Sequence, residues 1–347
     1  MLKVTNNETY IIAEIGQNHN GDVQIAKKII DQLDRYPYDE ISGNRLNKVN
    51  AIKLTKRDLT EELSEEGMKK PYTGKHSFGA TYGEHREFLE LSYEQHVELG
   101  HYIKSKGFEL VETLCSVKTL KLLDMIKVDK VKVASRDLTN IPLLKALAKR
   151  PEPVILSTGM ADKMDLINAI KVFQEEGKIN VSVLHCLSQY PAEYEKLNLH
   201  TIPYLIETFP HIKIGYSDHS LGTHIPVAAV AMGAEIIEKH VTLNRSMKGT
   251  DHAGSADIDT FFNMVHDIRT LDISFGEFEI TRDPVVASAK DKLERSLALK
   301  VDKAKGEIIT EEDLHMISPG DGLKWQHRHM FVGKPASEDY KANTLLN

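Results

Sequence analysis

The sequence has little of several features that would mark a special class of protein. Its 347 residues include two cysteines, Cys115 and Cys186, and one tryptophan. Two cysteines cannot build the disulfide framework of a small secreted domain, so we expect a reducing compartment. No apolar run approaches the roughly 18 residues of a membrane-spanning helix, and no apolar signal segment follows Met1. These absences predict a cytoplasmic protein.

An excess of positive charge is also missing. The 44 Lys and Arg residues against 51 Asp and Glu residues give a formal net charge of −7. A nucleic-acid-binding protein would show a basic stripe, so we expect no nucleic-acid partner. An anionic small-molecule substrate stays open, because a local site can be positive on a negative protein. The hydrophobic share of 41% and the charged share of 27% are ordinary for a globular protein and exclude wholesale disorder.

Short apolar runs alternate with amphipathic segments along most of the chain. The predicted strands are residues 10–16, 49–55, 108–114, 130–135, 153–158, 181–187, 213–218 and 234–241. The predicted helices that follow them are residues 23–36, 92–106, 117–126, 141–148, 163–176, 199–209, 221–232 and 257–274. Most of the strands are rich in Val and Ile, which is typical of strands covered on both faces. Eight such units predict an α/β fold, a (β/α)₈ TIM barrel rather than an open doubly wound sheet.

Two segments break this alternation. The connection at residues 56–91 is far longer than the roughly 2–6 residues usual between a strand and its helix. We expect a lid or a substrate wall there, with disorder as the alternative. After a polar linker, closely spaced turn signals such as Ser318-Pro319-Gly320 predict a small β-rich domain. The predicted organisation is a barrel domain at 1–280, a linker at 281–294 and a second domain at 295–347.

Polar or ionisable residues lie at the C-terminal end of every predicted strand. Barrel enzymes bind their substrates at this end, whereas a purely structural barrel has no reason to collect such groups there. The candidate site residues are Glu14, Lys53, Thr113, Lys132, Ser135, Asp137, Ser157, Ser188, Tyr190, Ser217, His219, His240 and Asp251. The pattern therefore predicts an active site at this end of the barrel.

Three subsets of these residues suggest chemistry, each beside a plainer alternative. His219 and His240 end neighbouring strands and could bind one divalent cation, or they could be unrelated histidines. Lys132 among several hydroxyl groups suits a phosphate or a carboxylate, although Ser and Thr also fill barrel layers. Glu14 lies inside an apolar strand and must be paired or functional, because burying an unpaired charge costs several kcal/mol. A structural ion pair with Lys53 is its alternative.

Motifs at these positions resemble the sialic acid synthase family, which includes spore-coat polysaccharide synthases and legionaminic and pseudaminic acid synthases. The matching motifs are IIAEIGQNHNG at 11–21, YGEHREFL at 82–89, STGM at 157–160, IGYSDHS at 214–220, IEKH at 237–240 and MKGTDH at 247–252. The resemblance implies a TIM barrel followed by an antifreeze-like (SAF) domain. It also implies a condensation of phosphoenolpyruvate with the open-chain aldehyde of a hexose derivative such as N-acetylmannosamine. The products would be a nine-carbon 2-keto-3-deoxy acid and phosphate.

The resemblance further implies a role for each candidate. His219 and His240 would hold a divalent metal, Mn²⁺ in the first place and Mg²⁺, Co²⁺ or Zn²⁺ as alternatives, which polarises the aldehyde. Together with these histidines, Glu14 and Lys53 would be catalytic, Glu14 by stabilising the cationic centre or orienting water. The implied phosphoenolpyruvate-binding residues are Thr113, Lys132, Ser135, Ser157, Ser188 and Ser217. The implied sugar-binding residues are Lys53, Asp137, Tyr190 and Asp251.

The tail departs from the family pattern at one position. The family has an Arg-Pro-Gly turn whose arginine reaches the partner subunit's site in a domain-swapped homodimer, and this chain has Ser318 there. Serine is too short and lacks the charge to replace arginine, and Arg328 is a candidate substitute.

Two other functions stay open. One is a 3-deoxy-ulosonate synthase that acts on a phosphorylated aldose. The candidate ligands for its second phosphate are Lys69, Lys70, Lys75 and Arg86. The other is a barrel that binds sugars or phosphates without turning them over. In every case we expect small-molecule substrates and no membrane partner.

Overall fold

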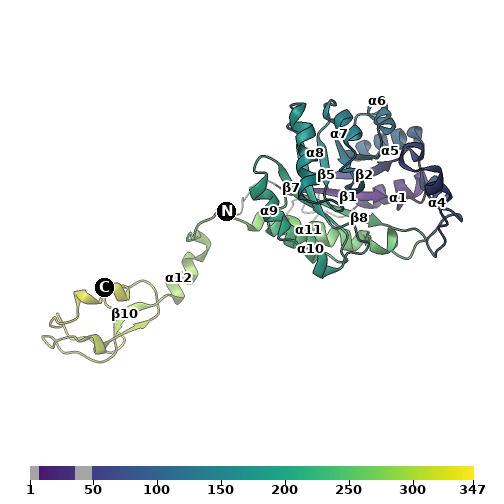
Figure 1. Cartoon of the computed structure of the whole chain (residues 1–347). Helices are drawn as coiled ribbons and strands as arrows, with labels where there is room; N and C mark the ends of the chain where they lie inside the picture. Colours follow the sequence, from purple (N-terminus) through teal and green to yellow (C-terminus); the bar gives the residue numbers. More distant parts are fainter. Residues whose placement is uncertain (1–7, 36–48) are drawn as a thin grey trace. The chain divides into compact units, whose positions relative to one another are not determined.

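The chain folds around a closed barrel of parallel strands (Figure 1). The computed structural model describes residues 8–35 and 49–347. The barrel strands are β1 (Tyr10–Gly16), β2 (Ala51–Lys56), β3 (Glu109–Leu114), β4 (Lys130–Val133), β5 (Val154–Ser157), β6 (Val181–Cys186), β7 (Lys213–Asp218) and β8 (Ile236–Thr242). Each strand pairs with the next, and β1 also pairs with β8, which closes the ring. The predicted TIM barrel is confirmed. A short strand, β9 (Ala256–Asp257), pairs with the end of β8.

Helices surround the barrel in the predicted order (Figure 1). They are α1 (Val23–Asp34), α5 (Tyr93–Ser105), α6 (Leu122–Met125), α7 (Ile141–Ala148), α8 (Lys163–Glu175), α9 (Thr201–Thr208), α10 (His224–Ala231) and α11 (Ile258–Ser274). The segment predicted as one helix at 117–126 begins as a 3₁₀ turn before α6. Residue 36, the predicted end of the first helix, lies outside the described residues. On α8, the residues Leu166, Ala169, Ile170 and Phe173 are buried, with the spacing of one helical face.

The inside of the barrel contains an apolar layer and a polar layer. Successive side chains of a strand point to opposite faces, so residues two positions apart share a face. Ile12, Ala51, Val111, Ile155, Leu184 and Ile236 form a separate buried apolar cluster. Two residues further along the same strands stand Glu14, Lys53, Thr113, Ser157, Cys186 and Glu238. The strand register therefore places a ring of polar groups directly above an apolar base.

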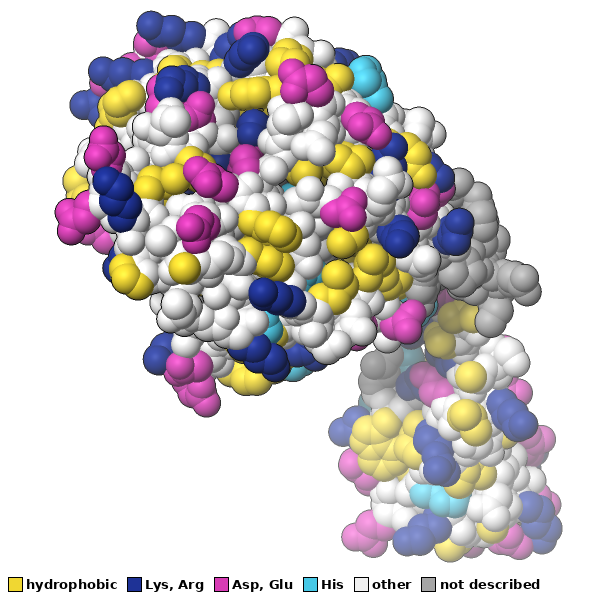
Figure 2. Space-filling view, turned by 90° about the vertical axis from the view of Figure 1, so that its right-hand side faces the viewer, with side chains coloured by type: hydrophobic (Ala, Val, Ile, Leu, Met, Phe, Trp, Pro, Cys, Tyr) yellow, Lys and Arg dark blue, Asp and Glu magenta, His cyan; other side chains and the backbone are white. Residues whose placement is uncertain are grey.

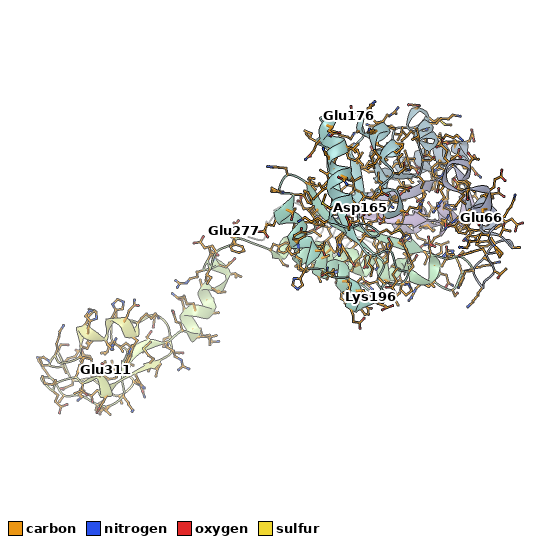
Figure 3. The ribbon with its side chains drawn as sticks, viewed as in Figure 1. Glu66, Asp165, Glu176, Lys196, Glu277 and Glu311 are labelled. Carbon is orange, nitrogen blue, oxygen red and sulfur yellow. The ribbon has the colours of Figure 1, made fainter. Side chains whose placement is uncertain are left out.

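The long connection after β2 is largely helical. It contains α2 (Leu59–Glu62), α3 (Glu65–Lys69) and α4 (Tyr82–Leu89). Thr81 and Glu84 form a capping box that fixes the start of α4. The side chain of Glu66 on α3 is exposed (Figure 3). Disorder, the plainer alternative for this segment, is therefore wrong, whereas the role of a substrate wall depends on the cavity described below.

The C-terminal part of the chain is a second compact unit, Glu277–Asn347, separate from the unit that ends at Gly276. The antiparallel strands β10 (Ser296–Leu299) and β11 (Leu314–Ile317) pack on a small core that includes Leu297, Leu299 and Ile309. The side chain of Glu311, between these strands, is exposed (Figure 3). The segment predicted as a linker includes a helix, α12 (Ala287–Leu293). The antifreeze-like identity of this unit stays a prediction.

The surface agrees with the mixed composition. On the barrel face in Figure 2, side chains of Lys and Arg are interspersed with those of Asp and Glu, without a broad region of one sign. In the described ranges 8–35 and 49–347, no helix is both long and apolar enough to cross a bilayer.

Candidate active site

A cavity of about 400 Å³ lies at the C-terminal ends of the barrel strands. All eight strands contribute to its lining, and so does the long connection after β2. The sequence-predicted residues that line it are Glu14, Lys53, Thr113, Lys132, Ser135, Ser157, Ser188, Tyr190, Ser217, His219, His240 and Asp251. Its volume lies within the usual range for small-molecule sites, about 300–1,000 Å³. The structure thus brings together nearly all the predicted residues in one place.

Asp137 is the exception among the predicted residues. It lies in a 3₁₀ turn after β4 and is buried, with its Oδ2 atom 3.4 Å from Nε of Arg136. Arg136, and not Asp137, lines the cavity. The carboxylate is therefore placed to hold this arginine, whereas its predicted contact with the sugar stays a prediction.

Four buried charged residues form the floor of the cavity: Glu14, Lys53, Lys132 and Glu238. Nζ of Lys53 lies 3.3 Å from Glu14 Oε1 and 3.3 Å from Glu238 Oε2. Nζ of Lys132 lies 3.4 Å from Glu238 Oε1. Two cations and two anions balance, which limits the large cost of removing each charge from water. The ion pair between Glu14 and Lys53 that the sequence left as the plain alternative is present, and it belongs to the lining of the cavity.

The pKa values of the two carboxyl groups of the floor are shifted in opposite directions. Burial raises the pKa of Glu14 to about 7, although Lys53 pulls it down. Burial also acts against ionisation of Glu238, but Lys132, Lys53 and a hydrogen bond from Ser217 outweigh it and hold the pKa of Glu238 well below its usual range. Near neutral pH, Glu238 is therefore a fixed anion, whereas Glu14 can take up or release a proton. Such a split between two carboxyl groups is characteristic of acid–base sites.

Beside the floor lies a cradle of hydrogen-bond donors. The backbone N–H of Gly159 donates to Ser135 Oγ at 3.0 Å. A Cβ atom on Gly159 would come within 2.4 Å of Ser188 Oγ and 2.8 Å of Ser135 Oγ, so a side chain there would displace these hydroxyl groups. Among the described residues, the buried Oγ of Ser157 has no hydrogen-bond partner. A buried polar atom without a partner is costly, and an anion beside Lys132 would satisfy it.

His219 and His240 face each other in the same cavity. Their ring centroids are 5.5 Å apart, and the Tyr190 ring lies 3.9 Å from that of His219. Nδ1 of His219 donates to the carbonyl of Leu187 at 2.7 Å, which leaves Nε2 as the free lone pair. Burial lowers the pKa of His240 to about 3, so this ring is neutral, the form that binds metals.

These two histidines fit a divalent cation that takes its other ligands from substrate or water. The buried Nδ1 of His240 lacks a hydrogen-bond partner within the described part of the chain. No group of three or more His, Cys, Asp or Glu residues in residues 8–35 and 49–347 is arranged to hold a metal. The described residues thus do not supply a complete set of metal ligands. Two histidine ligands are present, and the other coordination positions would be open to water or substrate.

Gly16 lies between the carboxyl group of Glu14 and the ring of His240. It ends β1 at a break in the strand register and has a φ of +53°. A Cβ atom here would come within 3.1 Å of both Glu14 Oε1 and His240 Cε1. The close approach of the carboxyl group and the imidazole thus depends on the absence of a side chain.

Several residues of the cavity were missed as site residues in the sequence. Glu238 stands two positions before His240 on β8, so strand alternation could have found it. Cys186, whose Sγ is 3.8 Å from Nδ1 of His219, also lines the cavity, and a lone cysteine in an apolar strand gives no signal of such a place. Arg57 lines the cavity from the connection after β2, where no periodic signal exists. Arg86 had been considered only for a phosphorylated substrate, and it also lines the cavity.

Comparison with known proteins shows the family to which the chain is similar. The NeuB family model matches residues 43–279. The human N-acetylneuraminate-9-phosphate synthase is 34% identical over 94% of this chain and 88% of its own length. The N,N'-diacetyllegionaminic acid synthase of Legionella pneumophila is 34% identical over 97% of this chain and 93% of its own.

Solved structures agree as well. The N-acetylneuraminic acid synthetase of Leptospira borgpetersenii superposes with a TM-score of 0.68 at 31% identity, over 82% of this chain and 90% of its own. A spore coat polysaccharide biosynthesis protein of Bacillus subtilis gives a TM-score of 0.64 at 26% identity, over 99% of this chain and 95% of its own. The resemblance seen in the sequence motifs is confirmed, and the chain belongs to the NeuB family.

Proposed function

We propose that this chain condenses phosphoenolpyruvate with the open-chain aldehyde of a hexose derivative, giving a nine-carbon 2-keto-3-deoxy acid and phosphate. Synthases of sialic, legionaminic and pseudaminic acids are its relatives, which supports a condensing enzyme that makes nonulosonic acids. The observation that carries the proposal is one cavity with three features: a floor of paired charges, two facing histidines, and the buried Ser157 hydroxyl group, which has no hydrogen-bond partner among the described residues. A barrel that only binds sugars would not need a carboxyl group poised to exchange a proton near pH 7.

The anionic substrate is assigned to the cradle. Lys132 supplies a positive charge, and the hydroxyl groups of Ser135, Ser157 and Ser188 line the same part of the cavity. These donors suit the phosphate and carboxylate oxygens of phosphoenolpyruvate. Thr113 and Ser217 hydrogen-bond to the floor instead, Thr113 from Lys53 at 3.2 Å and Ser217 to Glu238 at 2.9 Å. Their role is to hold the two lysines and carboxylates in position.

In the reaction, carbon 3 of phosphoenolpyruvate forms a bond with the aldehyde carbon, and the aldehyde oxygen takes a proton to become a hydroxyl group. Water then adds to the cationic carbon 2 and gives up one proton, which balances the proton taken by the aldehyde oxygen. The bond from carbon 2 to the phosphate oxygen breaks, the phosphate leaves with the second water proton, and the ketone remains. Glu14 is suited to this step, because its ionised form stabilises the cationic carbon and accepts the proton of the water. Glu238 remains ionised throughout and pairs with both Lys53 and Lys132.

The aldehyde end of the sugar is assigned to the side of the cavity formed by β7 and β8. His219 and His240 would hold a divalent cation, most suitably Mn²⁺, with Mg²⁺, Co²⁺ and Zn²⁺ as alternatives, and the ion would supply Lewis-acid polarisation of the aldehyde oxygen. Tyr190 packs against His219 and fixes its ring plane. Asp251 lines the same cavity and can accept hydrogen bonds from sugar hydroxyl groups.

Phosphate release tests this proposal directly. Purified protein is incubated with phosphoenolpyruvate, a panel of hexose derivatives and each divalent metal in turn, and phosphate and the 2-keto acid are measured. Phosphate release that requires both an aldose and phosphoenolpyruvate is the expected result. A protein that binds these compounds but releases no phosphate with any aldose or metal would contradict the proposal and favour the binding-only barrel. The domain-swapped homodimer is tested separately by sedimentation.

A further inference from the structure

The turn that carries His219 is joined to β8 by a buried ion pair. The backbone pairing of β7 with β8 ends at Asp218 and Lys239, which stand opposite each other. His219 is the residue after Asp218, and His240 is the residue after Lys239. His219 therefore lies just beyond the last paired position, so its distance to His240 depends on contacts other than this backbone ladder.

Lys239 binds both sides of the turn. Its Nζ pairs with Asp218 Oδ2 and also donates to the carbonyl oxygen of Ser220 at 2.8 Å. The other carboxylate oxygen of Asp218, Oδ1, accepts a hydrogen bond from the backbone N–H of Ser220 at 3.0 Å. One lysine on β8 thus holds the residue before His219 and the residue after it. We call Asp218, Ser220 and Lys239 the clamp.

The ion pair of the clamp faces away from the cavity. Successive side chains of a strand point to opposite faces. Ser217 and Glu238 line the cavity, so Asp218 and Lys239 point toward the surrounding helices, on the face where Tyr216 joins the main apolar core. Neither residue of the pair is among the described residues that line the cavity. The pair can therefore affect a reaction in the cavity only through its neighbours in the chain.

Stability alone is a weak reason for such a pair. The side chains of Lys239 and Asp218 are 2% and 0% exposed. Apolar side chains of similar volume often stabilise a protein as well as a buried ion pair does, because the loss of hydration cancels the attraction between the charges. A buried pair does fix positions, since both groups stay paired and hydrogen-bonded in few arrangements. The clamp thus sets the relative positions of the residues beside it.

The hydrogen bonds of His219 itself run to another part of the barrel. Its Nδ1 donates to the carbonyl of Leu187 at 2.7 Å, and its own carbonyl accepts from the backbone N–H of Ala192 at 2.9 Å. Both partners belong to the connection after β6, so these bonds hold His219 relative to β6. The clamp joins the same turn to β8, the strand that carries His240. It is thus the contact suited to maintain the 5.5 Å between the two ring centroids.

We propose that Asp218 and Lys239 are positioning residues, which hold His219 at the distance from His240 at which both imidazoles can bind one divalent cation. This inference rests on the proposed function and deepens it. Two ligands that are already in place bind an ion more tightly than two that have to be ordered first, because the ordering cost does not fall on the binding step. Breaking the clamp should therefore weaken metal binding without removing any group that touches metal or substrate.

The affinity for Mn²⁺ tests the proposal. The double variant Asp218→Asn/Lys239→Met removes both charges together, so that neither is left buried without a partner. Its asparagine oxygen can still accept the N–H of Ser220, and its methionine fills the volume of the lysine stem, but the link from β8 to the turn is lost.

The Kd for Mn²⁺ is measured by calorimetry on the full chain, freed of metal by a chelator and without substrates. We expect the double variant to raise this Kd by about 10- to 100-fold, the size typical of losing contacts that orient metal ligands. Cooperative thermal unfolding will show that the variant is folded. Its phosphate release should recover when Mn²⁺ is raised above the new Kd, because every reacting group is still present. Activity that stays low at saturating Mn²⁺ would contradict a purely positioning role.

Glu112→Gln is the matched control. Glu112 on β3 and His96 on α5 form another fully buried pair, with 3.0 Å between Oε1 and Nδ1, and β3 lies opposite β7 in the ring of eight strands. This variant should also lose stability, but its Kd for Mn²⁺ should stay within about 2-fold of the wild type, because distant sites act independently. A wild-type Kd in the double variant, or an equal rise in the control, would overturn the role of the clamp.

Crystal structures of the wild type and the double variant separate this inference from the proposed function. If the wild type binds no Mn²⁺, the two-histidine metal site fails, and the clamp is then judged by the separation of the two rings alone. Rings of His219 and His240 that move apart or turn in the double variant support the clamp. Rings that keep their wild-type positions refute it.

Discussion

The floor and three arginines, Arg57, Arg86 and Arg136, line the same cavity, but different parts of the fold position them. The floor residues Glu14, Lys53, Lys132 and Glu238 stand on four barrel strands, and the strand register fixes their heights. The arginines stand on a loop, a short helix and a 3₁₀ turn. The rigid strands thus hold the paired charges of the floor, whereas the connections hold the arginines. Barrel enzymes in general vary their substrates through these connections.

The largest expected effect concerns the histidines. His219→Ala and His240→Ala should each lower phosphate release by about 10³-fold or more, since Lewis-acid stabilisation is worth several kcal/mol. Chelator treatment of the wild type should give a similar loss, restored by added Mn²⁺. Thermal unfolding should show an intact fold. Unchanged turnover in either variant would contradict the proposal that His219 and His240 hold a divalent cation.

Removing one charge from the floor should destabilise the whole barrel. Lys53→Met leaves Glu14 and Glu238 without their shared cation, and we expect a loss of about 3–5 kcal/mol in the free energy of unfolding. The matched control is Lys27→Met, which breaks the exposed ion pair with Glu98 and should cost less than about 1 kcal/mol. Denaturant titration measures both variants. Equal losses would show that the floor is not a tightly coupled network.

The pH dependence of kcat/KM tests the role of Glu14 in the floor. Because this carboxyl group has to be ionised to accept a proton, kcat/KM should rise with pH through an apparent pKa near 7, and Glu14→Gln should abolish this acid limb. The raised pKa has the opposite effect on stability. The folded state holds a proton that the unfolded state has already lost, so the contribution of Glu14 to stability falls as pH rises from its ordinary pKa of 4.5 to about 7. A pH profile that stays flat between 5 and 8 would contradict the role of Glu14.

The smallest expected effect concerns the helix that bears Arg86. Thr81→Ala removes the cap of α4 and should cost about 1 kcal/mol. Because α4 belongs to the entrance and not to the strands, the KM for the aldose should rise by a few-fold, whereas the KM for phosphoenolpyruvate should stay constant. Steady-state kinetics with each substrate varied in turn will show the difference. A matching rise in both constants would show that entrance and floor respond as one unit.

The sequence predicted the barrel well because the strands repeat one signal. Tyr10–Gly16 and Lys213–Asp218 have the predicted bounds, and the other strands differ by at most a few residues at their ends. The candidate site residues gather at one cavity for the same reason, since every parallel strand delivers its last residues to the same end. Only Asp137 among them stands outside the lining.

The remaining features depend on contacts that a single sequence does not contain. Glu238 bridges two lysines from β2 and β4, and this pairing follows from ring closure and not from spacing along the chain. Arg57 and Arg136 are distant in sequence and meet at Glu62. The helices α2 and α3 span four and five residues, too short for a periodic pattern to reveal. Contacts between different elements were therefore harder to foresee than the strand ends themselves.

The bare backbone at Gly16 limits how this enzyme can change. A Cβ atom here would press on both the carboxyl group of Glu14 and the ring of His240, and the new residue would also have to adopt a left-handed conformation. Random replacement at this position should therefore return glycine alone among active clones. New sugar preferences must arise elsewhere, in the segments around the entrance, where side chains can be exchanged without altering the spacing between proton acceptor and ligand.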